Sequence, residues 1–396
     1  MLEIIIDKNQ EEEKIALLEN GNLIEYYDNN LKENRNEGNI YLGIVKDIIP
    51  GMQSAFVDIG TEKNSFIHLK DILPKVDETK EKQDLSLKIS DVIKPNQKIL
   101  VQVKKDSNEQ KGARVSTHIN LPGRYTVLMP DVNIITISQK IEEKAEQQKL
   151  IEIVKNNISN NNGAIIRTSA KGKEKEIIED IKNLENKWQK IKETFKNQEK
   201  HLNEGKLLYK AENIVQKMII DLSGKNIEKI TVNNKQENDD IVKFIEENIK
   251  NSNIKVEYLE KPNILSEYYI DKQLEKISKR KIWLKCGGFI TIDKTEALTA
   301  IDVNTGKYTG NKDIEQTIYT VNKEATIEIA KQLRLRDIGG IIIIDYIDMK
   351  NQINKQKIEE LLKERLKEDR SKTQVEGFTK LDLMEMTRKH ICSHKE

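Results

Sequence analysis

The sequence predicts a multidomain α+β protein, on three observations. The chain has 396 residues, which is enough for more than one hydrophobic core. Residues 39–103 hold short runs of apolar residues separated by tight turns, a pattern typical of a small β-barrel. Residues 213–260 and 283–368 instead alternate helical and strand patterns, as α/β units do.

The composition is that of a soluble globular protein. Hydrophobic residues make up 37% of the chain and charged residues 34%, and the 67 Lys and Arg nearly balance the 66 Asp and Glu. Net charge therefore gives no sign of a polyanionic partner, and any nucleic-acid site must be a local cluster. We see no signal peptide and no run near the about 20 apolar residues of a membrane span. The two distant cysteines, Cys286 and Cys392, fit a reduced compartment, so we expect a cytoplasmic protein.

The first half of the chain predicts mostly strands. Residues 1–35 read as two strands joined by a turn at 20–22, too few to form a core alone. Apolar residues spaced by four and three positions predict one long helix over 177–195. The other strands predicted in this half lie at 39–49, 54–60, 64–69, 97–103, 125–129 and 163–168.

The second half predicts helices and strands in alternation, with one hairpin. The elements predicted there are, in order, a helix to 222, a strand at 227–232, a helix at 239–249, a strand at 254–258, hairpin strands at 288–293 and 298–302, a helix at 313–336, a strand at 341–344 and a final helix at 355–368.

Two apolar runs in this half end abruptly in an aspartate, Asp302 and Asp345. A carboxylate at the end of a buried strand is costly unless something pairs with it. If the intervening helix returns the chain to a neighbouring strand, the two acids meet at one edge of a sheet, and Asn304 shares the face of Asp302. Mg²⁺ takes one or two carboxylates together with waters and phosphate oxygens, so the pair predicts an enzyme that cuts phosphodiesters.

The alternative interpretation is structural: each aspartate caps a helix or ends a turn. For either residue alone this alternative stays open. Asp293, at the predicted hairpin turn, and Asp348, just after the second strand, are interpreted as bystanders of this kind.

Longer stretches around the two acids resemble a known family. They are residues 283–293, 295–307 and 330–349, and they resemble the ribonuclease E/G family, with the similarity continuing in the same order over nearly the whole chain. The absence of a long scaffold tail favours the shorter of the family's forms. The resemblance implies a Mg²⁺-dependent endoribonuclease with Asp302 and Asp345 as metal ligands and Asn304 as a third catalytic residue. The ion would activate a water for attack on the phosphate.

The resemblance also implies a substrate and products. These are single-stranded RNA, AU-rich and bearing a 5′-monophosphate, cut to 5′-phosphate and 3′-hydroxyl ends in the processing of rRNA precursors and the decay of mRNA. The chief rival interpretation is a non-catalytic S1 RNA-binding or scaffold protein. A third is a metal phosphohydrolase that acts on DNA or small phosphate esters.

The resemblance further implies four parts of the chain. Residues 1–36 and 213–278 would form a ribonuclease-H-like subdomain, and residues 279–396 a DNase-I-like catalytic subdomain. Residues 37–118 would form an S1 domain, which is an OB-type barrel, and residues 119–212 a 5′-sensor region.

Three residues of the predicted S1 domain match RNA-contacting positions of the family. Phe56 and Phe66 would stack on bases, and Lys111 would meet the phosphate backbone. From the sequence alone the two phenylalanines fit a barrel core equally well, and Lys111 fits an ordinary solvated lysine.

The 5′-sensor of the family falls on residues 165–168. Arg167 would grip a terminal phosphate bidentately and Thr168 would add its hydroxyl, while the segment from Gly123 to Val127 would complete the pocket. Without the family, Arg167 and Thr168 read as a surface pair. Where the family often has a second arginine this chain has Lys372, which keeps the charge but lacks the planar fork.

The last eight residues, 389–396, contain no Cys-Pro-x-Cys, the zinc-binding link of the family. We therefore do not predict a zinc-linked assembly, although a homodimer stays compatible with the sequence. Cys392, with His390 and His394 on either side, has the residue types to bind a metal across two chains, but we expect these residues to lie in a frayed tail.

Overall fold

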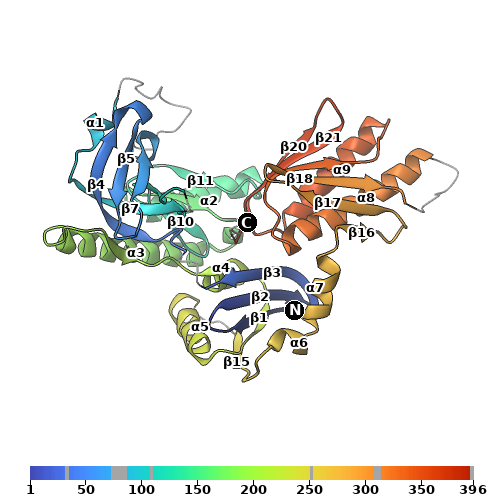
Figure 1. Ribbon diagram of the computed structural model, residues 1–396, viewed down its shortest axis with the longest axis horizontal. Coiled ribbons are helices and arrows are strands. Elements are labelled where there is room, and N and C mark those ends of the chain that lie inside the picture. Colours follow the sequence, from blue (N-terminus) through green and yellow to red (C-terminus); the bar gives the residue numbers. More distant parts are fainter. Residues whose placement is uncertain (32–34, 73–86, 108–109, 250–252, 307–313, 393–396) are drawn as a thin grey trace. The chain divides into compact units, whose positions relative to one another are not determined.

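The computed structural model describes residues 1–31, 35–72, 87–107, 110–249, 253–306 and 314–392, and Figure 1 shows their helices and strands. The chain divides into two compact units. The first joins Met1–Glu33 and Ile214–Gln216 to Lys225–Glu396, and the second contains Asn34–Asn213 and Lys217–Gly224. Both units mix helices with sheets, so the predicted α+β class is confirmed. The four-part division is finer than these two units and stays a prediction.

Five strands of the second unit close into an OB-like barrel, as predicted. They run in the order β4-β5-β6-β8-β7, and β7 pairs with β4 to close the ring. Valine and isoleucine side chains fill the interior, among them Val45, Val57 and Ile67, because β-branched residues pack well against a curved sheet. The barrel strands are β4 (Ile40–Ile49), β5 (Ser54–Asp58), β6 (Ser65–His68), β7 (Lys98–Lys105) and β8 (Arg114–Ser116), with β13 (Lys206–Tyr209) outside β4 and short helices at Pro50–Met52, Leu69–Asp71 and α1 (Ile89–Val92).

The rest of the second unit is a small sheet with two helices. The sheet has the order β11-β12-β10-β9, and the apolar stripe predicted over 177–195 forms the buried face of the longer helix. Ile177 and Ile181 of that stripe pack with strand residues in one core cluster. The elements are β9 (Leu121–Pro122), β10 (Thr126–Met129), β11 (Ile135–Ile137), β12 (Gly163–Ile166), α2 (Lys144–Asn157), a short helix at Thr168–Ala170, α3 (Glu174–Gln198) and α4 (Ile214–Leu222), which the division into units cuts.

The N-terminal residues form three strands rather than the two predicted. Asn9 makes the unpredicted turn, because its side-chain oxygen accepts hydrogen bonds from the N–H groups of Glu11 and Glu12 at 2.8 Å each. An Asx turn of this kind carries no glycine or proline to mark it. The sheet of the first unit that contains these strands has the order β15-β14-β1-β2-β3. Its elements are β1 (Leu2–Lys8), β2 (Glu12–Glu19), β3 (Asn22–Asn30), β14 (Ile227–Val232) and β15 (Lys255–Tyr258), with α5 (Lys235–Asn248), α6 (Ile264–Glu267) and α7 (Ile270–Ile277).

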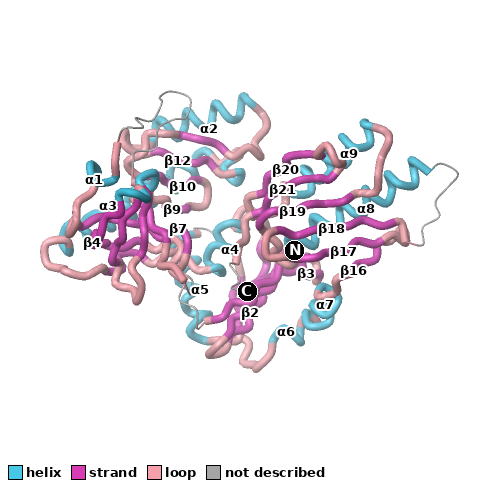
Figure 2. Tube along the Cα trace, turned by 45° about the horizontal axis from the view of Figure 1, so that its top comes forward, coloured by secondary structure: helices cyan, strands magenta, loops and turns pink. Residues whose placement is uncertain are grey.

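The second sheet of the first unit carries the two predicted acids. Its order is β16-β17-β18-β19-β21-β20 (Figure 2), and α8 and α9 contribute to its core. The elements are β16 (Lys281–Trp283), β17 (Phe289–Lys294), β18 (Leu298–Asn304), α8 (Ile314–Leu335), β19 (Gly340–Asp345), α9 (Gln352–Leu366), β20 (Thr373–Phe378) and β21 (Leu383–Arg388).

The C-terminal region differs from the prediction in two respects. The helix at 352–366 is not the final element, because the hairpin of β20 and β21 follows it. Cys392 is not in a frayed tail: its side chain is buried, and its N–H donates to Asp337 Oδ2 at 2.7 Å. Asp337 also pairs with Arg388, at the end of β21, over 2.8 Å between Nη1 and Oδ1. The chain is thus anchored as far as Cys392.

Candidate active site

The sheet around the two aspartates alternates strictly between a buried and an exposed face. Ile301 and Val303 of β18 point into the core with Ile342 and Ile344 of β19. The residues between them, including Asp302, face solvent. Side chains along a strand alternate in this way, so the apolar residues fix the strands and leave the acids on the open face.

Asp302 and Asp345 lie side by side on that open face. The strands β18 and β19 are parallel neighbours, and the Cα atoms of the two aspartates are direct partners in the register. Neighbouring strands lie about 4.8 Å apart, so the two carboxylates are close enough to share one cation. The prediction that the helix after β18 returns the chain to an adjacent strand is therefore confirmed.

Asn304 joins the pair from the same strand. Its Nδ2 donates to Asp302 Oδ2 at 2.5 Å, because residues two apart on a strand share a face. This contact orients one carboxylate oxygen of Asp302 and leaves the other for a ligand. A single amide thus holds the carboxylate in a fixed direction.

The local charge of the pair is unfavourable without a cation. Burial, and then the negative charges of Asp302 and Asp348, raise the pKa of Asp345 above its ordinary value. Like charges at one place favour the protonated form, and a bound cation reverses that preference. Asp348 therefore contributes to the field at the site.

The donor set fits Mg²⁺ better than a transition metal. Over the described residues no three His, Cys, Asp or Glu side chains gather, as they do around a zinc ion. Two carboxylates are few for Zn²⁺ or Ca²⁺, whereas Mg²⁺ keeps several waters and takes further oxygens from a substrate phosphate. Asp302 and Asp345 would hold the ion.

A buried asparagine that the sequence did not single out positions the chain after Asp345. Asn322 of α8 is fully buried. Its Nδ2 donates to the carbonyl of Ile347 at 2.8 Å, and its Oδ1 accepts from the N–H of the same residue at 3.1 Å. An asparagine inside an apolar helix stripe was the available signal, because such a residue needs buried partners.

Asp293, interpreted as a bystander, is engaged elsewhere. Its carboxylate pairs with Arg280, with 2.6 Å between Nη2 and Oδ2. The guanidinium, as a hydrogen-bond donor and a positive charge, lowers the pKa of Asp293 below its ordinary value. Asp293 lies on the same open face as the carboxylate pair, opposite Ala300 of β18.

In the barrel, Phe56 and Phe66 are neighbours on the outside rather than in the core. Their Cα atoms are direct partners between β5 and β6. Phe56 is 39% exposed and Phe66 is half-buried, and His68 packs edge-on against Phe66 with 5.3 Å between ring centroids. The core interpretation of these phenylalanines, left open by the sequence, does not fit the structure. They form an exposed aromatic pair.

The backbone segment that contains Lys111 packs beside the strand of Phe66. It is exposed and precedes Gly112, where an added Cβ would lie 1.9 Å from the carbonyl oxygen of Asn64. The segment therefore presses against the start of β6, and Ala113 accepts a hydrogen bond from the N–H of Phe66 at 2.9 Å. The structure brings Phe56, Phe66 and Lys111 into one region of the barrel.

The predicted sensor residues of the second unit also come together. Arg167 Nη1 donates to the carbonyl of Gly123 at 2.8 Å, and Val127 is the register partner of Ile165 in the adjacent strand. Thr168 is exposed and its hydroxyl lies 2.9 Å from that of Ser138.

Two carboxylates that the sequence did not point to hold this region. Asp221 forms an ion pair with Arg167, and Asp180 accepts from the N–H groups of Tyr125 and Thr126 at 2.9 Å each. These partners are distant in the sequence. Lys372, the other predicted sensor residue, belongs to the first unit and is exposed.

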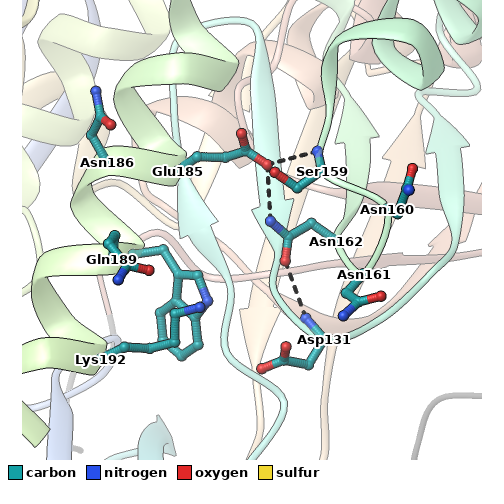
Figure 3. Close-up of a pocket in the computed structure, with 10 residues that line it drawn as sticks. Asp131, Ser159, Asn160, Asn161, Asn162, Glu185, Asn186, Gln189 and Lys192 are labelled. Carbon is teal, nitrogen blue, oxygen red and sulfur yellow. Dashed lines mark hydrogen bonds between the residues drawn. The ribbon is translucent and has the colours of Figure 1, made fainter. Parts of the chain in front are cut away.

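A polar pocket of about 580 Å³ lies elsewhere in the second unit. Figure 3 shows Glu185 among the residues that line it, and one carboxylate oxygen of Glu185 accepts from the N–H of Ser159 and from Asn162 Nδ2, each at 2.9 Å. None of the predicted site residues lines this pocket.

Comparison with known proteins identifies relatives of this chain. A model of the Ribonuclease E/G family matches residues 120–391. Ribonuclease G of Escherichia coli (strain K12) is 36% identical over 392 residues, which cover 98% of this chain and 79% of the relative. Ribonuclease G of Haemophilus influenzae is 38% identical over 393 residues, with the same coverage of 98% and 79%.

A longer relative matches as well, and the likeness again spans the chain. Ribonuclease E of Buchnera aphidicola is 34% identical over 408 residues, covering 99% of this chain and 41% of the relative. Among the described helices none is long and apolar enough to cross a bilayer. Identity of 34–38% over 98–99% of this chain shows common descent, and the chain belongs to the ribonuclease E/G family.

Proposed function

We propose that this chain cuts single-stranded RNA with a Mg²⁺ ion held by Asp302 and Asp345. Membership of the family makes the chain an endoribonuclease; the proposal concerns the ion, the residues and the substrate. The observation that carries it is the register, which sets the two aspartates directly opposite each other on an exposed sheet face.

The residues of the site divide the chemistry between them. Bound Mg²⁺ would supply Lewis acidity toward the phosphate and a water of lowered pKa. Asp302 and Asp345 bind the ion, and Asn304 fixes the direction of the Asp302 carboxylate through its 2.5 Å hydrogen bond. Asn322 holds the backbone after Asp345 in place. The products we propose are 5′-phosphate and 3′-hydroxyl ends.

The barrel and the sensor region would select the RNA. The barrel fits an S1 domain over residues 37–118, and residues 119–212 fit a 5′-sensor region. The remaining parts would be a ribonuclease-H-like subdomain (1–36 and 213–278) and a DNase-I-like catalytic subdomain (279–396). The protein would be cytoplasmic. Its substrates would be AU-rich single-stranded segments of rRNA precursors and of mRNA.

The first experiment measures cleavage of a 5′-monophosphorylated, AU-rich single-stranded RNA with and without Mg²⁺. We expect cuts only with the ion, and products that polynucleotide kinase labels at the 5′ end only after phosphatase treatment. RNA binding without any cleavage would favour the rival interpretation, a scaffold on an inactive nuclease fold. Equal cleavage of DNA would favour the broader phosphohydrolase.

Removing the exposed phenylalanine ring of the barrel should weaken RNA binding and leave the fold intact. Stacking of a base on an aromatic ring is worth about 1–3 kcal/mol, so we expect Phe56→Ala to raise the Kd for single-stranded RNA about tenfold. Fluorescence anisotropy measures the Kd. The control is Met52→Ala, since Met52 is 66% exposed in the same barrel but has no ring. Equal Kd values for the two variants would contradict the stacking role.

Removing the guanidinium of Arg167 should weaken discrimination between 5′ ends. A hydrogen bond to a charged group is worth about 1.5–3 kcal/mol, so Arg167→Ala should reduce the rate ratio of 5′-monophosphate to 5′-hydroxyl RNA about tenfold. Taking the ratio within one variant cancels any loss of folded protein through the ion pair with Asp221. Arg167→Lys, which keeps the charge without the fork, should retain part of the preference. An unchanged ratio in both variants would reject the sensor.

A further inference from the structure

Beside the carboxylate pair, the open sheet face carries an aromatic cluster made of Lys281, Trp283 and Phe289. Trp283 is 54% exposed, although tryptophan buries most of its surface in an ordinary strand. Its ring meets Phe289 edge-on with 5.3 Å between centroids. An exposed tryptophan held by a second ring needs an explanation that core packing does not supply.

The register connects this aromatic cluster to the carboxylate pair. Trp283 is the partner of Phe289, and Phe289 is the partner of Asn304. Directly opposed residues of neighbouring strands point to the same face, so Trp283, Phe289 and Asn304 form one row across the sheet. Trp283 lies two strands from Asn304, which is about 10 Å at the usual strand spacing.

A lysine gives the aromatic cluster positive charge. Lys281 Nζ lies 3.5 Å from the ring centroid of Phe289 and 4.3 Å from that of Trp283. Lys281 belongs to the parallel row that also contains Thr291, Asp302 and Asp345. A cation over aromatic faces stabilises the rings in one orientation, and it favours a polyanionic ligand over a neutral apolar one.

The backbone after the active-site strand is shaped to fit the tryptophan. Gly306 has φ +58°, and an added Cβ would lie 3.3 Å from Cζ3 of Trp283 and 2.5 Å from the carbonyl oxygen of Gly287. Glycine at this position therefore lets the chain leaving Asn304 pass against the indole. The ring is fixed on two sides and still exposed.

We propose that Trp283, backed by Phe289 and charged by Lys281, stacks on a nucleobase of the RNA next to the scissile phosphate. The inference rests on the proposed function, because it places a neighbouring nucleotide of the same substrate. Single-stranded nucleic acid is bound by aromatic rings beside basic groups, and duplex RNA keeps its bases stacked away from such a ring. The cluster thus selects unpaired RNA at the cutting centre itself.

The binding test uses the full chain carrying Asp302→Asn, so that the RNA is bound and not cut. We expect a single-stranded, 5′-monophosphorylated RNA of about 12 nucleotides to quench tryptophan fluorescence, and Asp302→Asn with Trp283→Phe to show no quenching. The other tryptophan, Trp188, is 4% exposed and supplies a constant background. Quenching that rises with protein concentration in the absence of RNA would indicate a contact between copies and overturn the proposal.

The kinetic test compares Trp283→Ala with Trp283→Phe in the otherwise wild-type chain. Loss of one base stack should lower kcat/KM about 5- to 150-fold, and the phenylalanine variant should retain most of the wild-type value. An abasic residue at the stacked nucleotide should slow the wild type and leave Trp283→Ala unaffected. The matched control is Tyr258→Ala, a 42% exposed ring on the other sheet of the unit, which should cut at the wild-type rate.

The outcomes separate this inference from the proposed function. If the wild type cuts RNA, Asp302→Asn does not, and Trp283→Ala matches the wild type within twofold, the aromatic proposal is wrong and the centre is right. If the wild type does not cut, the proposed function fails, and fluorescence quenching still reports on Trp283 independently.

Discussion

Replacing either Asp302 or Asp345 with asparagine should lower kcat/KM for RNA cleavage at least about a thousandfold, because each change removes one of two carboxylates that hold the ion. Asparagine keeps the shape of the side chain and an acceptor oxygen, so the contact with Asn304 Nδ2 can persist at position 302. Single-turnover cleavage at saturating Mg²⁺ measures the loss. Addition of Mg²⁺ should raise the melting temperature of the wild type and of neither variant.

The control for these two variants is Asp293→Asn. Asp293 lies on the same open face of the sheet, but its carboxylate forms an ion pair with Arg280 and does not belong to the carboxylate pair. It should cut within a few-fold of the wild type. Without metal, neither Asp302→Asn nor Asp345→Asn should melt earlier than the wild type, because each removes the repulsion between the two carboxylates, which after burial is the next cause of the raised pKa of Asp345. Wild-type cleavage by both variants would contradict the assignment.

The carboxylate pair could be predicted because every step depends on local sequence. Each strand is largely apolar and carries its acid near the carboxyl end: β19 ends at Asp345, whereas β18 continues past Asp302 to Asn304, two residues beyond its predicted end. The apolar pattern of α8 shows how the chain returns. Right-handed crossover then leaves few arrangements other than two adjacent parallel strands. The register sets Asp302, two residues before the end of β18, opposite Asp345, the last residue of β19.

The residues that hold the predicted site residues in place could not be predicted from the sequence in the same way. Arg167 is recognisable from its segment, but its ion pair with Asp221 joins residues 54 positions apart. The exposure of aromatic side chains could not be predicted from the sequence either. Phe56 and Trp283 are of residue types that usually lie in the core, and only the closed barrel and the sheet edge show that they face outward. Function at these positions depends on which face of a strand is covered.

Buried charge explains why the last hairpin was missed. In β21 the inward positions are Met384, Met386 and Arg388. The arginine breaks the apolar alternation that marks a strand, and it is tolerated because Asp369 and Asp337 neutralise it at 2.7 and 2.8 Å. A sequence pattern contains no information on such distant partners.

The same kind of buried charge makes Glu25 a residue whose loss should strongly destabilise the first unit. Glu25 of β3 has no exposed surface, and it accepts from Arg334 Nε at 2.8 Å and from Arg370 Nη2 at 2.6 Å. Removing one partner of a buried ion pair leaves the other charges buried and unpaired, which costs about 3–5 kcal/mol. Glu25→Gln should therefore lower the free energy of unfolding of this unit by that amount at neutral pH. Urea denaturation followed by circular dichroism measures it.

The pH dependence distinguishes the charge of Glu25 from its packing. Burial alone would raise its pKa, but the charges of Arg370 and Arg334 hold the pKa at about 2, below the about 4.3 of an unfolded glutamate. A lowered pKa means that the stabilisation is complete above about pH 4.3 and is lost as the pH falls toward 2. The gap between wild type and Glu25→Gln should thus be widest near neutrality and shrink on acidification. Glu12→Gln, in a surface pair with Lys14, should change stability by under about 0.5 kcal/mol, and a Glu25 gap that is constant with pH would show that packing, not charge, is responsible.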